Sequence, residues 1–187
     1  MTAQQTPPLS SFAAVHEGQD LDAARAAILY TAVRLPSPSV PALSAALYLA
    51  DRLHLSRYGA LMFGGYYEAL KHGPAPVGVY GLLRAAQRTG GAYGFTVTVQ
   101  GAGHAAPLIL AHAEPDMTEL SAGVLDSLDA VLAEHGQQSG EALSLLSQDE
   151  AWKLCAPGEV MTAELIASTL PNARAVLDYL ADPHPDD

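Results

Sequence analysis

Residues 66–76 read YYEALKHGPAP, and this stretch decides how the rest of the sequence is interpreted. Pro74 and Pro76 fix their own φ angles and bias the residue before each toward extended geometry, so the block from Gly73 onward is stiff. Before the block, a short helix is expected from Tyr66 through Leu70 to Gly73, because glycine suits a left-handed helix C-cap. The stretch therefore predicts a short helix that leads into a rigid turn.

Five tyrosines lie within 33 positions around this stretch: Tyr48, Tyr58, Tyr66, Tyr67 and Tyr80. A buried tyrosine usually needs a hydrogen-bond partner for its hydroxyl, so a core with satisfied phenols is one interpretation. Aromatic residues are also over-represented in protein interfaces, so a recognition surface is the other. The sequence alone leaves both interpretations open.

Helical patterns flank the stretch on both sides. A helix over residues 21–34 is expected to be capped by Asp20, and a second over about residues 42–55 follows Pro41, which fits the first turn of a helix. A third is expected over residues 77–88, ending at two glycines. Residues 1–18 are polar and aperiodic, which predicts a flexible N-terminal arm.

The middle of the chain changes its period. Residues 95–99, FTVTV, alternate as a half-buried strand does, and residues 107–112 form a second β-rich run. Glycines lie between the two runs, so the pattern predicts a small β-hairpin.

Helices are expected again in the last third of the chain. Ser121 can cap a helix to about His135, and Ser139 can open another. The sequence from Ser147 to Glu150 resembles a capping box that leads into the helix of Trp152. A last helix over 162–180 should be interrupted at a proline, and residues 183–187 should fray. The prediction is a single, mostly α, compact multi-helix domain over residues 19–182 with one small β-hairpin.

Composition limits the class of protein. Apolar residues make up 49% and charged residues 16%, which excludes wholesale disorder. No apolar run approaches the roughly 20 residues that span a bilayer, so no membrane association is expected. Residues 1–8 show no signal-peptide pattern, and Cys155 is the single cysteine, so a cytoplasmic protein is expected.

The net charge of −11 is unevenly distributed. Residues 1–113 hold five acidic and seven basic residues, a net charge of +2, whereas residues 114–187 hold fifteen acidic and two basic residues, a net charge of −13. Nucleic-acid binding needs a dense basic face, so direct nucleic-acid binding is not expected. The acidic part could attract a basic protein partner or serve as a solubilising surface.

Catalytic and cofactor signatures are weak. Residues 101–106, GAGHAA, match a dinucleotide fingerprint in form, but a strand-like run follows them where a helix is required. The seven histidines show no helical ligand spacing, although His104 and His112 could meet across the hairpin. Cys155 has apolar neighbours and no evident base, so it is expected to be a small core residue. We therefore expect no catalytic residue, no cofactor and no metal.

The order of the motifs resembles the N-terminal half of the Panacea family, the SocA-like antitoxin domains that are often phage-associated. The motifs that carry the resemblance are Leu47-Tyr48-Leu49-Ala50-Asp51-Arg52, Tyr58-Gly59, Tyr67-Glu68-Ala69-Leu70-Lys71-His72-Gly73-Pro74-Ala75-Pro76 and Val79-Tyr80, followed by Leu120-Ser121, Leu143-Ser144 and Ala151-Trp152. The resemblance covers about residues 22–166. The chain departs from the family pattern at Gln148, where a histidine is usual, and at Ala75, where valine is preferred.

The resemblance implies a helical antitoxin, not an enzyme, that neutralises a toxin encoded beside it by direct protein contact. It also implies an adaptor role that delivers the toxin to the ClpXP protease. The partner-binding residues expected are those of the tyrosine and Gly-Pro segment, with charge assistance from the acidic part: Tyr58, Tyr66, Tyr67, Lys71, His72, Pro74, Pro76 and Tyr80. The alternative is an enzyme or small-ligand binder with a cleft near Tyr66, Lys71 and His72.

Overall fold

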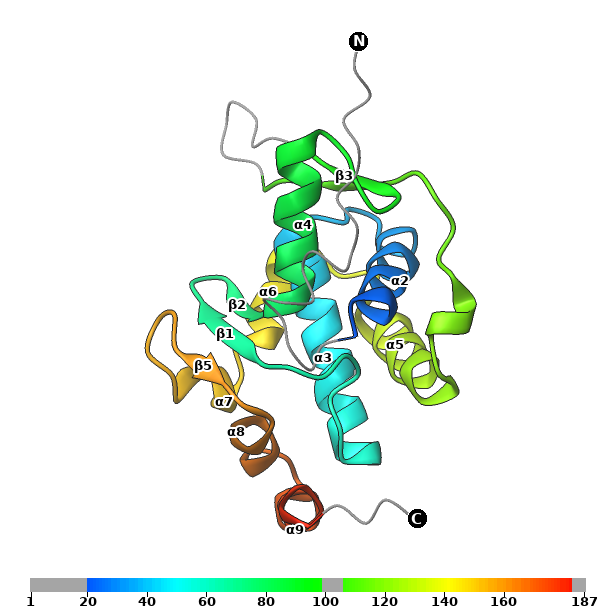
Figure 1. Ribbon diagram of the computed structural model, residues 1–187. Coiled ribbons are helices and arrows are strands. Elements are labelled where there is room, and N and C mark those ends of the chain that lie inside the picture. The colour runs from blue at the N-terminus through cyan, green and yellow to red at the C-terminus, as the bar shows by residue number, and fades with distance from the viewer. Residues whose placement is uncertain (1–19, 99–105, 183–187) are drawn as a thin grey trace.

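Helices make up most of the structure, a computed structural model that describes residues 20–98 and 106–182 (Figure 1). The mostly α fold class is therefore confirmed, while the predicted arm 1–18 and tail 183–187 lie outside the described residues. The helices are α2 (Leu21–Ala32), α3 (Val40–Tyr58), α4 (Val77–Thr89), the 3-10 helix η1 (Met117–Glu119), α5 (Ala122–His135), α6 (Gly140–Ser147), α7 (Glu150–Lys153), α8 (Ala163–Ser168) and α9 (Ala173–Ala181). The strands are β1 (Tyr67–Leu70), β2 (Gly73–Pro76), β3 (Phe95–Val97), β4 (Ile109–Ala111) and β5 (Val160–Met161).

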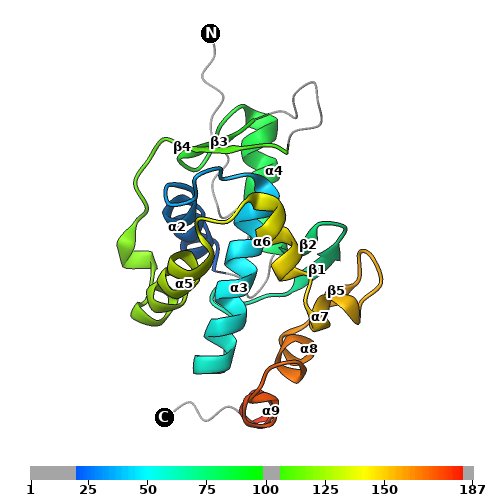
Figure 2. The same ribbon diagram turned by 180° about the vertical axis from the view of Figure 1, so that it is seen from behind.

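Helix α3 is the central element, and α2, α5, α6, α8, α9 and β2 all pack against it (Figures 1 and 2). It begins two residues earlier than predicted because the hydroxyl of Ser39 accepts a hydrogen bond from the backbone N–H of Ala42 at 3.3 Å. It also runs beyond the predicted end at residue 55, up to Gly59, whose φ of 71° closes the helix in the left-handed region. This length lets one helix support both halves of the molecule.

Most of the predicted helix starts are confirmed by their capping hydrogen bonds. The carboxylate of Asp20 accepts from Ala23 N–H at 2.9 Å, and the hydroxyls of Ser121 and Ser139 cap α5 and α6. The predicted capping box at Ser147 is wrong, because Ser147 ends α6 and its hydroxyl donates to the carbonyl of Ser144 at 2.8 Å. Asp149 caps α7 instead.

The helix predicted from Tyr66 through Leu70 is a strand, which is the main correction to the sequence analysis. β1 pairs with β2 antiparallel, with Tyr67 opposite Pro76 and Leu70 opposite Gly73, so Lys71 and His72 form the turn. The side chains of β1 alternate between buried and half-buried, which is the period of a strand. β2 occupies an edge of the three-stranded sheet β2-β1-β5, where proline is tolerated.

The predicted hairpin in the middle of the chain is confirmed. β3 and β4 pair antiparallel, and residues 99–105 of the loop between them, with His104, lie outside the described residues. Two further backbone hydrogen bonds fix the hairpin beside the start of α3: Val40 N–H donates to the Pro107 carbonyl at 2.9 Å, and Ile109 N–H donates to the Pro38 carbonyl at 2.8 Å. The hairpin therefore stands at one end of the helical layer.

Two hydrophobic clusters form the core. The larger is built from α2, α3, α4, α5 and the β3–β4 hairpin, with Ile28, Leu47 and Leu82 completely buried. The smaller joins the far side of α3 to β1, β5, α8 and α9, and the half-buried Trp152 and Cys155 pack against it. The predicted interruption of the last helix is confirmed, because α8 ends before Pro171 and α9 starts after it.

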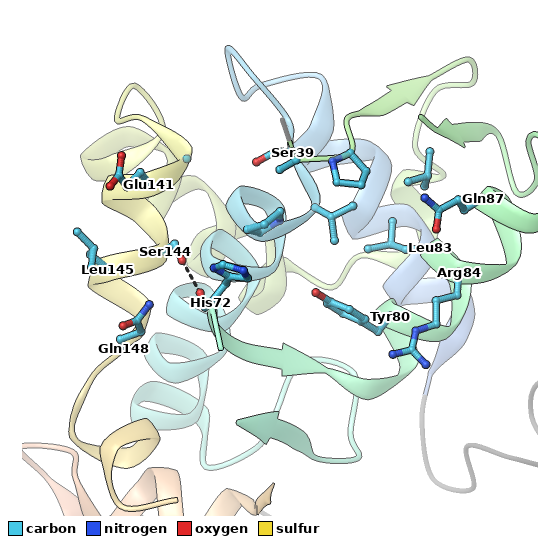
Figure 3. A pocket seen from close by; sticks show the side chains of 16 residues that line it. Ser39, His72, Tyr80, Leu83, Arg84, Gln87, Glu141, Ser144, Leu145 and Gln148 are labelled. Carbon is cyan, nitrogen blue, oxygen red and sulfur yellow. Dashed lines mark hydrogen bonds between the residues drawn. The ribbon is translucent and has the colours of Figure 1, made fainter. Parts of the chain in front are cut away.

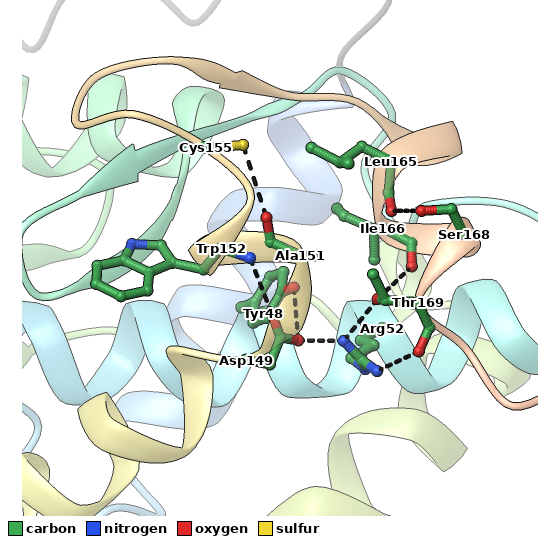
Figure 4. A network of polar contacts seen from close by, with 10 residues as sticks. All are labelled: Tyr48, Arg52, Asp149, Ala151, Trp152, Cys155, Leu165, Ile166, Ser168 and Thr169. Atoms are coloured by element: carbon green, nitrogen blue, oxygen red, sulfur yellow. Dashed lines mark hydrogen bonds and ion pairs between the residues drawn. The ribbon is translucent and has the colours of Figure 1, made fainter.

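A polar network ties the smaller cluster to α3 (Figure 4). The guanidinium of Arg52 forms an ion pair with Asp149 and donates to the carbonyl of Thr169 at 3.1 Å. The hydroxyl of Tyr48 donates to the same carboxylate at 2.8 Å. Both charged side chains are more than three-quarters buried, so the pair is weakly screened by salt. In the described part of the chain, no helix is both long and apolar enough to cross a membrane.

Candidate functional site

A groove of about 750 Å³ lies between α4 and α6 (Figure 3). No group of three or more histidine, cysteine, aspartate or glutamate side chains in the described residues is placed to hold a metal ion. The groove gathers side chains from several elements of the fold.

Two helices supply the walls of the groove. α4 contributes Tyr80, Leu83, Arg84 and Gln87, and α6 contributes Glu141, Ser144 and Leu145, followed by its C-cap residue Gln148. The α4 residues have the spacing i, i+3, i+4 and i+7, and Glu141, Ser144 and Leu145 have the spacing i, i+3 and i+4, which places each set on one face of its helix. Figure 3 shows the two sets on opposite sides of His72. The groove is thus bounded by one face from each of two helices.

The first turn of α3 and the β1–β2 turn supply the rest of the lining. Ser39, Val40 and Pro41 lie at the start of α3, and His72 comes from the hairpin turn. The ends of the β3–β4 hairpin close the far side through Val97, Ala106 and Pro107. Elements that lie far apart in the sequence therefore meet here because each of them packs on α3 or on its neighbours.

Close contact between the β1–β2 turn and α6 fixes the position of His72. The hydroxyl of Ser144 donates a hydrogen bond to the backbone carbonyl of His72. Gly73 has a φ of 120°, and a Cβ at this position would collide with the hydroxyl of Ser147. Only glycine satisfies both conditions without strain, so the Gly-Pro block holds the turn against α6.

The lining is apolar at its centre and carries one charge on each wall. Leu83 is buried, whereas the side chain of Leu145 is 62% exposed at the rim. Arg84 and Glu141 take part in none of the ion pairs found among residues 20–98 and 106–182. Burial raises the pKa of the Tyr80 hydroxyl, while the nearby Arg84 lowers it. The arrangement suits a partner that is itself apolar with charged flanks.

The structure brings two of the eight predicted partner-binding residues, His72 and Tyr80, into this groove. Lys71 is exposed next to His72 in the hairpin turn but does not line the groove. Pro74 and Pro76 are buried in β2 and do not line the groove.

The remaining three predicted residues, all tyrosines, lie elsewhere. Tyr58 is 46% exposed at the end of α3, where its ring lies against Gly123 of α5. Tyr66 is 41% exposed beside a small second cavity. Tyr67 is 1% exposed, so the structure assigns it to the core and leaves no surface for a partner.

The tyrosine in the core satisfies a buried carboxylate. The hydroxyl of Tyr67 donates to Asp51 at 2.5 Å, and the backbone N–H of Met62 donates to the other carboxylate oxygen at 2.5 Å. Burial raises the pKa of Asp51 to about 7, against the opposing effect of these two hydrogen bonds. The interpretation of the tyrosine cluster as a polar-lined core therefore holds for Tyr67 and for Tyr48, which is completely buried.

Sequence reasoning missed the residues that form most of the groove. The spacing of Tyr80, Leu83, Arg84 and Gln87 on one helix face was available, but many surface helices share it. A stronger signal was the number of leucines in α6. The helix buries Leu143 in the core, and Leu145 is a further leucine that stays exposed. The cleft near Tyr66, Lys71 and His72 is not formed as predicted, because only His72 reaches the groove.

Comparison with known proteins places these elements in a family. A family model described as "Antitoxin SocA-like, Panacea domain" matches residues 46–153, which is more than half of the chain. The match includes the whole of β1, β2, α4 and α6, and therefore both walls of the groove. It also includes Gln148, one of the two positions at which the chain departs from the family pattern, which lines the groove directly after α6. No curated protein and no solved structure matches the sequence.

Proposed function

The chain belongs to the Panacea-domain family of SocA-like antitoxins, and on that premise we propose that it neutralises a toxin by binding it directly. The toxin is a protein encoded next to the antitoxin, and both act in the cytoplasm. The observation that carries the proposal is the family match over residues 46–153, which contains both walls of the groove between α4 and α6. Residues 19–182 act as one domain in this role, because both hydrophobic clusters share α3.

A protein that neutralises a toxin by binding needs a toxin-binding surface, and the groove is the centre of that surface. A stable protein interface buries roughly 800 Å² on each partner, so the contact must extend beyond the groove to its rims. The exposed Leu145 and the adjacent Leu146, which is 42% exposed, give the α6 rim an apolar character. Burying such side chains supplies the hydrophobic part of the binding free energy.

The negative charge of the C-terminal part of the chain favours association with a basic toxin. The net charge of −13 over residues 114–187 attracts a basic toxin and speeds association at low salt. Asp129 and Glu134 are exposed on α5 and contribute to this field, while the exposed Asp126 is paired with Arg57 at 2.5 Å. Raising the salt concentration should therefore slow association more than it speeds dissociation.

An antitoxin that acts by binding alone should neutralise its toxin at a fixed molar ratio. If the protein is a stoichiometric antitoxin, a fixed amount of purified toxin should lose its activity in proportion to added antitoxin, with an end point at a constant molar ratio. Complete neutralisation by a small fraction of an equivalent would instead indicate an enzyme.

Co-expression tests the proposal in cells. The reading frame beside the antitoxin gene should prevent growth when it is expressed alone and permit growth when this chain is expressed with it. The two purified proteins should also elute together in gel filtration. A harmless neighbour, or a lethal neighbour that this chain neither binds nor rescues, would count against an antitoxin.

The adaptor role is a finer part of the proposal. An adaptor holds the toxin and the ClpXP protease at the same time, so it needs a second surface away from the groove. In that case the toxin should be degraded in cells only when this chain and ClpX are both present. A toxin that is neutralised yet equally long-lived without ClpX would restrict the function to direct inhibition.

A second candidate function is a small-ligand binding protein that uses the same groove. Its volume of about 750 Å³ falls in the range of small-molecule sites, and His72 and Glu141 offer polar contacts. A metabolite that raises the melting temperature of the wild-type protein, but not of a Tyr80→Ala variant, would favour this function.

A further inference from the structure

We propose that the groove between α4 and α6 binds an amphipathic helix of the toxin, with an acidic residue facing Arg84 and a basic residue facing Glu141. The inference rests on the proposed function and specifies the part of the toxin that the antitoxin recognises. Its grounds are the shape of the groove, the state of the neighbouring backbone and the charges on the two walls.

The walls have the dimensions of a helix-binding site. The α6 face from Glu141 to Leu145 spans four residue steps, or about 6 Å, and the α4 face from Tyr80 to Gln87 spans seven, or about 10 Å at 1.5 Å per residue. That length accommodates about two turns of a partner helix, and the groove volume of about 750 Å³ leaves space for its anchoring side chains. Grooves between two helices commonly bind helices whose apolar side chains recur at i, i+3 or i+4 and i+7.

The backbone around the groove argues against an added strand. A strand would need unpaired N–H and C=O groups along an open sheet edge. The segment that leads into β4 is already bonded to residues 38–40 at the start of α3, through the hydrogen bonds from Val40 N–H to Pro107 and from Ile109 N–H to Pro38. The edge strand β2 contains Pro74 and Pro76, which lack N–H groups, and all of its residues are buried. A helix satisfies its own backbone and needs neither edge.

Leu145 offers the strongest apolar anchor at the rim. Its side chain is 62% exposed, so free antitoxin leaves most of its apolar surface in water. Val40, Pro41 and the buried Leu83 continue the apolar lining inward from it. A leucine or phenylalanine of the partner helix can therefore lie between Leu145 and this inner surface, with both sides losing contact with water.

The charges of the walls set the orientation of the occupant. α4 carries Arg84 and Arg88 and no acidic residue, and α6 carries Glu141 and no basic residue. Arg84 and Glu141 form no ion pair within the described part of the chain. A partner helix with acidic residues on one flank and basic residues on the other would pair both walls in a single orientation. The reverse orientation would oppose like charges.

A pair of matched variants tests the apolar anchor. Leu145→Asp adds a charge within the groove, and Leu154→Asp adds the same charge to a leucine of equal exposure, 61%, which does not line the groove. Binding of the purified toxin encoded beside the antitoxin should weaken roughly tenfold or more for Leu145→Asp and remain within about threefold for Leu154→Asp. Unchanged circular dichroism and melting temperature would confirm that both variants fold.

Charge reversal tests the orientation. Arg84→Glu and Glu141→Lys should each weaken toxin binding roughly threefold to tenfold. Reversal of one acidic toxin residue to lysine should restore binding to Arg84→Glu and weaken binding to the wild type. Hydrogen exchange on the complex should protect one amphipathic helical segment of the toxin.

The outcomes separate the two proposals. A wild-type chain that neither binds nor neutralises the toxin overturns the proposed function and this inference with it. A wild type that neutralises the toxin while Leu145→Asp does so equally well overturns only the groove. Protection of an extended toxin strand, or self-association of this chain that Leu145→Asp abolishes, would also overturn the helix as occupant.

Discussion

Replacement of Asp51 by asparagine should remove a defined part of the pH dependence of this protein's stability. Burial raises the pKa of Asp51 from its ordinary value of 3.8 to about 7. Between these two values the folded state binds more protons than the unfolded state, so the free energy of unfolding falls as the pH rises. The stabilisation is fully present below about pH 4 and is lost as the pH passes through about 7.

The magnitude follows from the size of the shift. Each pKa unit corresponds to about 1.4 kcal/mol of unfolding free energy. The stabilisation that is lost between the two pKa values therefore amounts to about 4 kcal/mol. About 3 kcal/mol of this loss falls between about pH 5 and about pH 8. The asparagine side chain would keep an oxygen for the Met62 N–H but would not titrate. The stability of the wild type relative to Asp51→Asn should therefore fall by about 3 kcal/mol over this interval.

Three side chains surround the carboxylate of Asp51. Tyr67 donates to the carboxylate, Tyr48 packs edge-on against Tyr67 with ring centroids 5.2 Å apart, and Asp20 lines the same small cavity. Urea unfolding followed by circular dichroism at several pH values would measure the effect. The exposed Asp22→Asn should give a curve parallel to the wild type. If the Asp51→Asn curve were also parallel to it, the raised pKa would be refuted.

Three further variants test how the fold supports the groove, each by urea unfolding. Arg52→Ala should cost about 2 kcal/mol with little salt dependence, because it leaves the largely buried Asp149 without its cation; a loss that vanishes at about 1 M salt would contradict this. Gly73→Ala should cost several times more than Gly90→Ala, since both have positive φ but only the first meets a neighbouring side chain. Equal costs would show that backbone strain alone matters. Trp152→Phe should lower the free energy of unfolding by about 1 kcal/mol, because it removes the indole hydrogen bond of 2.9 Å to a carbonyl of β1. An unchanged free energy of unfolding would show that this hydrogen bond is dispensable.

Local signals were sufficient for most of the helices and for one hairpin. Asp20, Ser121 and Ser139 cap helices because the hydrogen bonds they make reach only two or three residues along the chain. The alternation in residues 95–99 likewise predicted β3, since a period of two is a property of the segment itself. The order of motifs was also sufficient to identify the family.

The prediction was wrong for segments whose conformation depends on residues far away in the sequence. Residues 67–70 form a strand because they pair with β2 on one side and with Val160 and Met161 of β5 on the other, and β5 could not be anticipated from the local pattern. Ser147 looked like a cap because of its spacing to Glu150, yet the chain places it at the end of the preceding helix. Short segments have weak intrinsic preferences, so tertiary pairing decides their conformation.

The sequence by itself determined the helical class, most helix ends, the central hairpin and the antitoxin family, because each depends on contacts within a short segment or on the order of residues. Only the tertiary structure decided that Tyr67 lies in the core and that His72 and Tyr80 line a groove with Leu145. The physical reason is that burial depends on what packs against a side chain. α4 and α6 share no local signal, and they form two walls because α4 packs on α2, β2 and β3 while α6 packs on α3 and β2.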